Sequence, residues 1–301
     1  MNMVTKFLRR VIWKLDKTIS KWFFRDQWII LTAKDQDIDS LSWSAFTHLD
    51  PPPDRYWADP FVIARDGLYY LFIEEKMYKT KKGHISCLVL DANGKILSNK
   101  IVLEHPYHLS YPFLFDYEGD LYMMPETAQN RSLDIYRCVE FPDQWEFVQP
   151  LMTDVYAVDA TLLEHGGKWW LFMNMKEHED SSSLDQLFLF YADNPLAKDW
   201  TAHPQNPVVE DFRRARPGGA FFSHQGNQVR PSQDNWMRYG YALNFNRITK
   251  LSETEYEEVC ERRFEPSALK KILATHTFNK AENMIVIDAK IRRLKSRHNR
   301  R

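Results

Sequence analysis

Five similarly spaced turns constrain the fold of this 301-residue chain more than any other feature. Four segments align without a gap: ADPFVIARDGLYYLF (58–72), SYPFLFDYEGDLYMM (110–124), VDATLLEHGGKWWLF (158–172) and PGGAFFSHQGNQVRP (217–231). They share one glycine column, and the steps between successive glycines are 52, 48 and 59 residues. A weaker fifth copy, THTFNKAENMIVIDA (275–289), has Asn283 close to the turn. Each copy is an apolar run, a turn and an aromatic-rich run, which predicts a β-hairpin.

Further strand-like runs lie between the copies, for example at residues 84–91, 132–140 and 185–193. Each repeating unit therefore has about four strands in roughly 40 to 60 residues, which is typical of β-propeller blades. The alternative, a two-sheet sandwich, gives no reason for five copies in one phase. We therefore expect an all-β fold, a five-bladed β-propeller over residues 23–289.

One segment between the fourth and fifth copies carries a helix signal. Ser252 and Glu255 make a capping-box pattern before YEEVCERR, which predicts a short helix over residues 252–263. We expect this helix to be an insertion before the last blade.

Positive charge is concentrated at the two ends of the chain, although the formal net charge is −1. Residues 1–22 hold six Lys and Arg and one acid, and residues 290–301 hold seven and none, so that the body carries −13. An acidic body disfavours nucleic acid as a partner, because phosphate contacts need clustered cations. The apolar residues of segment 1–22 recur near helical spacing with basic residues between them. This pattern predicts a basic amphipathic helix that either lies on an anionic membrane or docks on the propeller. Residues 290–301 predict a basic tail.

The cysteines and the lack of a targeting signal favour a cytoplasmic location. Cys87, Cys138 and Cys260 are an odd number with wide gaps, which fits neither a disulfide framework nor a zinc site. No stretch approaches the roughly 20 apolar residues of a membrane-spanning helix, and no cleavage pattern follows the basic N-terminus. We expect a cytoplasmic protein with no cofactor and no metal ligand set, peripheral at the inner membrane surface if residues 1–22 bind lipid.

Polar residues recur at two positions of the repeat, and these two columns predict one site. The first column, eight residues before the glycine, holds Asp59, Tyr111, Asp159 and Gly218, with His276 in the fifth copy. The second column, seven residues after the glycine, holds Glu74, Glu126, Asn174 and Gln233. Both columns lie at the hairpin end away from the turn, so they share one rim of the propeller. If the first strand of each blade is innermost, the first column surrounds the mouth of the central channel.

Such a ring of acids, amides and aromatic residues suits a sugar ligand. Carboxylates and amides hydrogen-bond hydroxyl groups, while Tyr56, Trp57 and Tyr111 could stack on sugar rings. Cleavage of a glycosidic bond needs one protonated acid and one base or nucleophile, which a pair of carboxyl groups can supply.

Simpler interpretations of the same residues stay open. Asp59 precedes a proline and could cap a turn. His276 could be a hydrogen-bonded core histidine. Arg216 and Arg230 could be structural ion-pair partners or ligands of an anion.

Two families of five-bladed propellers resemble this chain. ADPFVIARDGLYYLF and VDATLLEHGGKWWLF are similar to the first-blade and third-blade elements of glycoside hydrolase family 43. That resemblance implies a general base or nucleophile at Asp59 and, at Asp159, a residue that tunes the pKa of the acid. FRDQW, YWADPF, YPFLF, MMPET, GGAFF, RPSQD, YGYAL and THTF are more similar still to the propeller domain at the N-terminus of plant glucosamine inositolphosphorylceramide transferases.

The chain departs from glycoside hydrolase family 43 where that family has its catalytic acid. The family places an EGP element in its fourth blade, whereas this chain has ARPGGAFF, with Arg216 and Gly218. Either Glu126 or Glu74 supplies the acid from another blade, or the protein is not a conventional hydrolase. Arg216 and Arg230 would also suit a phosphate, a sugar nucleotide or an acidic sugar.

Three functions are therefore open for a propeller that binds a carbohydrate or a sugar phosphate. They are a glycosidase-like enzyme acting on a glycan or glycoconjugate, a glycosyltransferase or phosphorylase in polysaccharide or glycolipid assembly, and a non-catalytic carbohydrate-binding module. Our working hypothesis makes Asp59 the base or nucleophile, Glu126 the acid or a sugar ligand, and Asp159 a tuning carboxylate. The expected substrate contacts are Tyr56, Trp57, Glu74, Tyr111, Arg216, Arg230 and His276.

Overall fold

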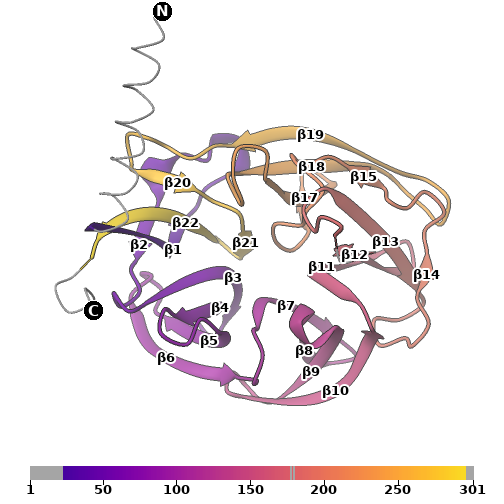
Figure 1. Ribbon diagram of the computed structural model, residues 1–301, viewed down its shortest axis with the longest axis horizontal. Coiled ribbons are helices and arrows are strands. Elements are labelled where there is room, and N and C mark those ends of the chain that lie inside the picture. Colours follow the sequence, from indigo (N-terminus) through magenta and orange to yellow (C-terminus); the bar gives the residue numbers. More distant parts are fainter. Residues whose placement is uncertain (1–22, 177, 179, 296–301) are drawn as a thin grey trace, which may run out of the picture.

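The chain folds as five antiparallel sheets arranged around one axis, so the predicted five-bladed propeller is confirmed (Figure 1). The computed structural model describes residues 23–176, 178 and 180–295. The first blade comprises β3 (Arg55–Arg65), β4 (Leu68–Met77), β5 (Gly83–Leu90) and β6 (Ile96–Leu103). The second comprises β7 (Ser110–Tyr117), β8 (Asp120–Glu126), β9 (Ser132–Glu140) and β10 (Gln144–Thr153).

The third and fourth blades continue in chain order. The third has β11 (Tyr156–His165), β12 (Lys168–Lys176) and β13 (Gln186–Ala192), with β14 (Thr201–Ala202) and β15 (Val209–Glu210) both paired to β13. The fourth has β16 (Phe222–His224), β17 (Asn227–Asp234), β18 (Ala242–Leu251) and β19 (Tyr256–Phe264). Short 3-10 helices lie at η1 (Ile38–Ser40), η2 (Trp43–Ala45) and η3 (Ala128–Asn130).

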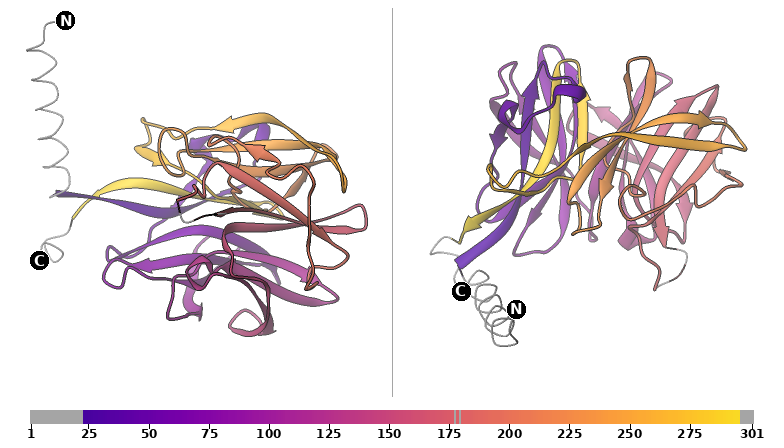
Figure 2. Two further views of the ribbon diagram at one scale, coloured as in Figure 1. Left: turned by 45° about the vertical axis from the view of Figure 1, so that its right-hand side comes forward. Right: turned by 90° about the horizontal axis from the view of Figure 1, so that it is seen from above.

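The fifth blade closes the ring because it combines strands from both parts of the chain. It contains β20 (Ile272–Ala274), β21 (Phe278–Ala281) and β22 (Met284–Leu294) together with β1 (Phe24–Lys34) and β2 (Thr47–Leu49). β1 pairs with β22 along its whole length, from Phe24↔Leu294 to Lys34↔Met284. β22 therefore includes residues 290–294, which the sequence analysis assigned to the tail. Figure 2 shows the paired ends of β1 and β22 projecting from the body of the ring.

The hydrophobic core is divided into packets, one between each pair of neighbouring blades. Apolar side chains on facing sheets bury one another there, which is the main favourable term in folding. Going around the ring from the first blade, representative buried residues are Leu109, Phe113, Leu187, Phe245 and Leu88. Because the blades pack through these side faces, the innermost strands leave their polar residues at the axis.

The prediction of a helix over residues 252–263 is wrong. Residues 256–264 form β19, the outermost strand of the fourth blade. The capping-box pattern closes a turn instead: Ser252 Oγ accepts the backbone N–H of Glu255 at 3.0 Å, and the backbone N–H of Ser252 donates to the Glu255 carbonyl at 2.9 Å. The same two residues satisfy either structure locally, and pairing with β18 decides between them.

The predicted amphipathic helix of residues 1–22 lies outside the described residues, as does the tail beyond residue 295. Within the described part of the chain, no helix has the length and apolar character needed to cross a membrane.

Candidate active site

The first-column residues stand at β-bulges on the innermost strands. The pairing of β3 with β4 slips by one residue between Ala58 and Phe61, and β7 and β11 show the same slip. Asp59, Tyr111 and Asp159 have φ angles of 50°, 44° and 51° at these bulges. A bulge with a left-handed residue turns its side chain out of the regular alternation of a strand. Asp59 and Asp159 therefore reach toward neighbouring blades near the axis.

Asp59 connects three blades. Its Oδ1 accepts a hydrogen bond from Thr277 Oγ1 at 2.8 Å, and its Oδ2 accepts the backbone N–H of Tyr111 at 3.3 Å. Burial raises the pKa of Asp59 to about 6, although nearby His276 lowers it and Asp159 raises it further. The Asp59 residue is only 6% exposed. A carboxyl group that titrates close to neutral pH is suited to act as a base.

His276 forms a buried ion pair with Asp288 of β22. Its Nδ1 lies 2.5 Å from Asp288 Oδ2, and its backbone N–H donates to Asp288 Oδ1 at 2.9 Å. The imidazole ring stacks on Trp28 at 4.2 Å and meets the edge of Tyr239 at 5.4 Å. Burial lowers the pKa of His276, but Asp288 and Asp59 outweigh that effect and raise it to about 9. The ring is therefore an imidazolium at neutral pH.

An Asp–Arg pair joins the third and fourth blades. Arg216 Nε donates to Asp159 Oδ2 at 2.5 Å, and Gln233 Nε2 donates to the same oxygen at 2.6 Å. Arg216 Nη2 lies 3.8 Å from Glu126 Oε2. The guanidinium group also lies over the Tyr239 ring, 5.2 Å from its centroid. Asp159 thus already compensates the charge of Arg216.

Glu126 has the properties of a carboxyl group that carries a proton. Burial and the neighbouring charge of Asp159 raise the pKa of Glu126 well above its ordinary value, against the lowering effect of Arg216. Its Oε2 is buried and makes no hydrogen bond with any described residue. The same holds for Asn174 Oδ1 and Gln233 Oε1, the second-column residues of the next two blades. Three second-column side chains thus each keep an oxygen able to accept a hydrogen bond from a ligand hydroxyl.

Glu74 is a second protonated acid, on the first blade. Its Oε1 accepts a hydrogen bond from the Tyr56 hydroxyl at 2.9 Å and lies 3.3 Å from His108 Nε2. The backbone N–H of Gly83 donates to His108 Nδ1, so a neutral His108 carries its proton on Nε2 and faces Glu74 as a donor. Burial, with a smaller contribution from Asp59, raises the pKa of Glu74 to about 8.

Replacing Glu74 with Gln should make stability less dependent on pH. Since the folded protein holds the Glu74 proton up to about pH 8 and the ordinary pKa of a glutamic acid is 4.5, stability is lost as pH rises from 4.5 to 8. Gln keeps an oxygen for Tyr56 and does not titrate. We expect parent and Glu74→Gln to unfold alike at pH 5 and the variant to be more stable at pH 9, by at least about 1 kcal/mol. Guanidinium unfolding at both pH values measures this difference, and equal stability at pH 9 would contradict it.

Two predicted sugar-stacking residues lie in the interior. Trp57 is 4% exposed and packs among apolar residues between the fifth and first blades, because adjacent strand residues face opposite sides and Tyr56 takes the side of the site. Tyr111 is fully buried, and its hydroxyl is 2.8 Å from both Thr161 Oγ1 and the backbone N–H of Gly219. Trp57 and Tyr111 therefore hold blades together, and neither offers a face to a sugar.

Arg230 also lies away from the site. Its Nε and Nη2 donate to the two carboxylate oxygens of Glu258 on β19, both at 2.8 Å, and the Arg230 residue is 1% exposed. Nη2 also donates to the carbonyl of Arg214 at 2.7 Å, which fixes the segment leading to Arg216. The structure thus places Arg230 in a structural ion pair, not at an anion site.

Four residues of the site were not identified from the sequence: Trp28, Tyr239, Thr277 and Asp288. Asp288 interrupts the apolar run MIVIDA, and an acid in a buried strand was the signal that could have found it. Tyr239 had no such signal, because it lies in a loop outside both columns. The loop reaches the site through Gly240, at φ 61°, where an added Cβ would come within 2.8 Å of the His276 side chain.

Asp59, His276 and Asp288 offer three possible metal-ligand atoms within 4.8 Å of one another. The imidazole nitrogen that faces Asp288 is engaged in the ion pair, and Asp59 Oδ1 accepts from Thr277. These residues fit an internal ion pair better than a cation site.

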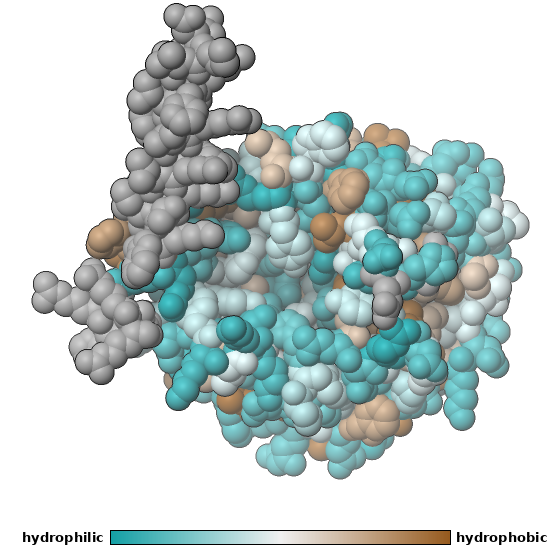
Figure 3. Space-filling model, viewed as in Figure 1, coloured by the Kyte–Doolittle hydropathy of each residue, from teal (hydrophilic) through white to brown (hydrophobic). Residues whose placement is uncertain are grey.

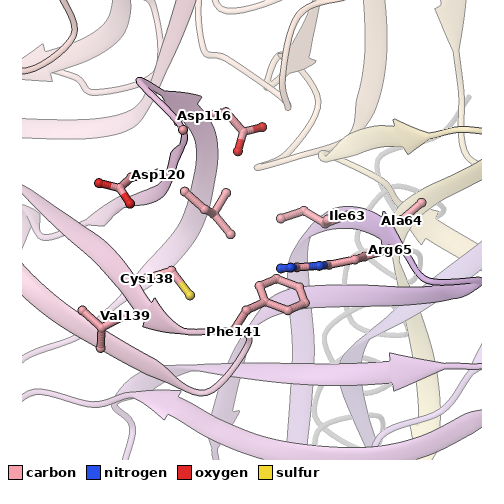
Figure 4. A pocket seen from close by; sticks show the side chains of 10 residues that line it. Ile63, Ala64, Arg65, Asp116, Asp120, Cys138, Val139 and Phe141 are labelled. Atoms are coloured by element: carbon pink, nitrogen blue, oxygen red, sulfur yellow. The ribbon is translucent and has the colours of Figure 1, made fainter.

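A different hollow lies on the opposite rim, beside the hairpin turns of the first two blades (Figure 4). Its charged side chains are partly exposed: Arg65 lies over the Phe141 ring at 4.7 Å, and Asp120 pairs with Arg137 at 3.6 Å. It gathers no buried acid, so it lacks the chemistry of the axial site.

Fold and site together define a class: five-bladed propellers whose axial site combines buried acids with cationic and aromatic side chains. The family model described as glucosamine inositolphosphorylceramide transferase 1, N-terminal, matches residues 44–286. The chain therefore belongs to this family, which confirms the closer resemblance noted in the sequence.

Curated relatives carry the name glucosamine inositolphosphorylceramide transferase 1. The proteins from Oryza sativa subsp. japonica and Arabidopsis thaliana are each 34% identical to this chain over 210 residues, 69% of its length. The chain spans only 28% and 27% of those relatives.

Solved structures of glycoside hydrolases have the same fold. Zg3597, a family 117 glycoside hydrolase from Zobellia galactanivorans, aligns with a TM-score of 0.56 over 88% of this chain and 90% of its own, at 11% identity. The catalytic domain of a Coprinopsis cinerea GH62 α-L-arabinofuranosidase also gives 0.56, over 78% and 90%, at 11% identity. At these identities the likeness shows the fold alone. The family and the fold together support a carbohydrate-related function.

Proposed function

We propose that the chain acts at a glycosidic bond of a glycan or glycoconjugate, with Glu126 as general acid and Asp59 as base or nucleophile. One observation carries this proposal. The second column gives three successive blades a largely buried, protonated Glu126, then Asn174 and Gln233, and each of the three has an oxygen that makes no hydrogen bond with any described residue. Acceptors in such an arrangement suit the hydroxyl groups of a sugar.

Glu126 and Asp59 can take different roles in the reaction because their surroundings give them different pKa values. Glu126 keeps its proton and can give it to the leaving oxygen of the glycosidic bond. Asp59, with a pKa of about 6, is ionised at neutral pH and can activate a hydroxyl group or attack the anomeric carbon. If the attacking hydroxyl belongs to water the result is hydrolysis, and if it belongs to another glycoconjugate the result is transfer. Asp159 holds Arg216 in place and favours the protonated form of Glu126.

The arrangement of the arginines favours a neutral sugar at the site over a phosphate. Arg216 is bound to Asp159 and lies near Glu126, and Arg230 is bound to Glu258. An anion would have to displace an acid from Arg216. Tyr239 is 44% exposed and lies over Arg216, so its ring is the aromatic surface on which a sugar can stack.

The experiment compares glycosides with good and poor leaving groups. The parent chain is screened for hydrolysis or transfer with nitrophenyl and alkyl glycosides of common sugars. Glu126→Gln should lower turnover of alkyl glycosides by about 10²- to 10⁴-fold, because their leaving group needs a proton, and should affect nitrophenyl glycosides much less. Glu118→Gln, in the exposed turn of the same hairpin, is the matched control and should leave turnover unchanged.

Two results would count against the proposal. Equal losses on both kinds of glycoside would show that Glu126 does not donate a proton. A parent chain that binds sugars without turning any of them over would be a binding module.

A further inference from the structure

Large apolar side chains are exposed on loops that leave the fourth blade. Trp236 and Met237, in the loop between β17 and β18, are 64% and 65% exposed. Leu269, in the loop between β19 and β20, is 96% exposed. Exposed apolar side chains that gather on one face mark an interaction surface.

Both loops emerge on the rim that carries the candidate active site. Gln233, which donates to Asp159, pairs with Leu243, and Leu243 pairs with Phe264. The chain leaves β17 just after Gln233 and leaves β19 at Phe264, so both loops begin at the level of the site. In the view of Figure 3, the surface around the central hollow is mostly hydrophilic or intermediate in hydropathy, with a few hydrophobic residues near it.

The ends of the described chain emerge on the same rim. β22 passes the site at Asp288 and continues to Leu294, which pairs with Phe24 at the start of β1. Leu294 is 72% exposed and Phe24 is 37% exposed. Residues 1–22, which precede Phe23 in the sequence, carry six Lys and Arg and one acid.

Positive charge accompanies the apolar residues on this rim. Arg238, Lys270 and Lys271 are exposed in the same two loops. Acids nearby are already paired, since Arg263 binds Asp234 at 2.6 Å and Glu265 at 3.0 Å. Tryptophan, leucine and methionine among exposed cations are the composition of surfaces that enter the interface of an anionic bilayer.

We propose that this docking rim, defined by Trp236, Met237, Leu269, Arg238, Lys270 and Lys271, binds an anionic lipid bilayer. The axial site then faces the membrane. Binding of the rim to the bilayer does not rest on the proposed function.

Sedimentation with lipid vesicles tests the docking rim with the full chain. The parent should bind vesicles of phosphatidylcholine with phosphatidylglycerol and not vesicles of phosphatidylcholine alone. The triple variant Trp236→Ser, Met237→Ser, Leu269→Ser should bind about tenfold more weakly or worse, because three apolar side chains no longer leave water. The control variant Leu97→Ser, Ile101→Ser, Phe147→Ser removes side chains of 54%, 51% and 56% exposure from outer strands and should bind like the parent.

A second measurement reports where Trp236 lies. Trp236→Phe should bind vesicles like the parent but lose part of the fluorescence quenching by lipids with brominated acyl chains. If the triple variant binds vesicles like the parent, or if Trp236→Phe leaves the quenching unchanged, the proposal that the docking rim binds the bilayer is wrong. If the triple variant loses binding of a soluble glycan and keeps vesicle binding, the rim contacts sugar instead, and the proposal is equally overturned.

The two proposals can fail separately. Asp59→Asn should bind vesicles like the parent, because Asp59 is buried at the axis. If the rim binds vesicles and no glycoside is turned over, the catalytic proposal is wrong and the docking-rim proposal still holds.

Discussion

Asp59→Asn should reduce turnover of every active glycoside by about 10³-fold or more, because it removes the base or nucleophile whatever the leaving group. The fold should survive. Asn tolerates the left-handed φ of 50°, its oxygen can accept the backbone N–H of Tyr111, and its NH₂ can donate to Thr277 Oγ1. Activity of the parent should rise with pH through about 6, the pKa of Asp59, since a base must be deprotonated.

The matched control for this substitution is Asp66→Asn. Asp66 also has a left-handed φ, of 52°, but its side chain is 88% exposed in a hairpin turn. It should leave both turnover and the unfolding midpoint unchanged. Asp59→Asn with turnover close to that of the parent would remove Asp59 from the mechanism, and a large drop in its unfolding midpoint would assign it a structural role.

The features of the fold that could be read from the sequence are those set by neighbouring residues. Asp66 and Gly67, at φ 52° and 75°, make a two-residue turn that few other residue pairs allow, and Gly119 and Gly226 stand at equivalent turns. These turns, with the apolar runs on either side, fixed the number of blades and the rim shared by the two columns.

What the sequence could not show depends on contacts between distant residues. The bulge at Asp59 and the burial of Trp57 follow from strand register, which alternation alone does not reveal. Arg216 could serve an anion or an acid, and only the approach of the third blade brings Asp159 to it. The 252–263 segment had a local pattern compatible with a helix, and pairing with β18 made it a strand. The candidate site was therefore predictable as a set of columns, but not as a network.

The ion pair between Asp288 and His276 is the contact on which stability of the site should depend most. Asp288 is fully buried and accepts from the backbone N–H groups of Asp59, His276 and Thr277 as well as facing the imidazole. Asp288→Asn removes the charge and points an NH₂ group at donors. We expect the free energy of unfolding at pH 7 to fall by about 3–5 kcal/mol, the usual cost of leaving a buried charge without its partner. Guanidinium unfolding measures it.

The effect of Asp288→Asn on the free energy of unfolding should depend on pH and on His276 if Asp288 stabilises the fold through its ion pair. Since the folded-state pKa of His276 is raised to about 9 from its ordinary value of 6.5, the ion pair stabilises the fold fully below about pH 6.5, and this stabilisation is lost as pH rises through 9. The difference in free energy of unfolding between the parent and Asp288→Asn should therefore become smaller toward pH 9. In a His276→Phe background, which keeps an aromatic ring on Trp28, Asp288→Asn should cost less, because no imidazolium is left unpaired. A loss that is the same at pH 6 and pH 9, and in both backgrounds, would show that Asp288 acts only as an acceptor for backbone N–H groups.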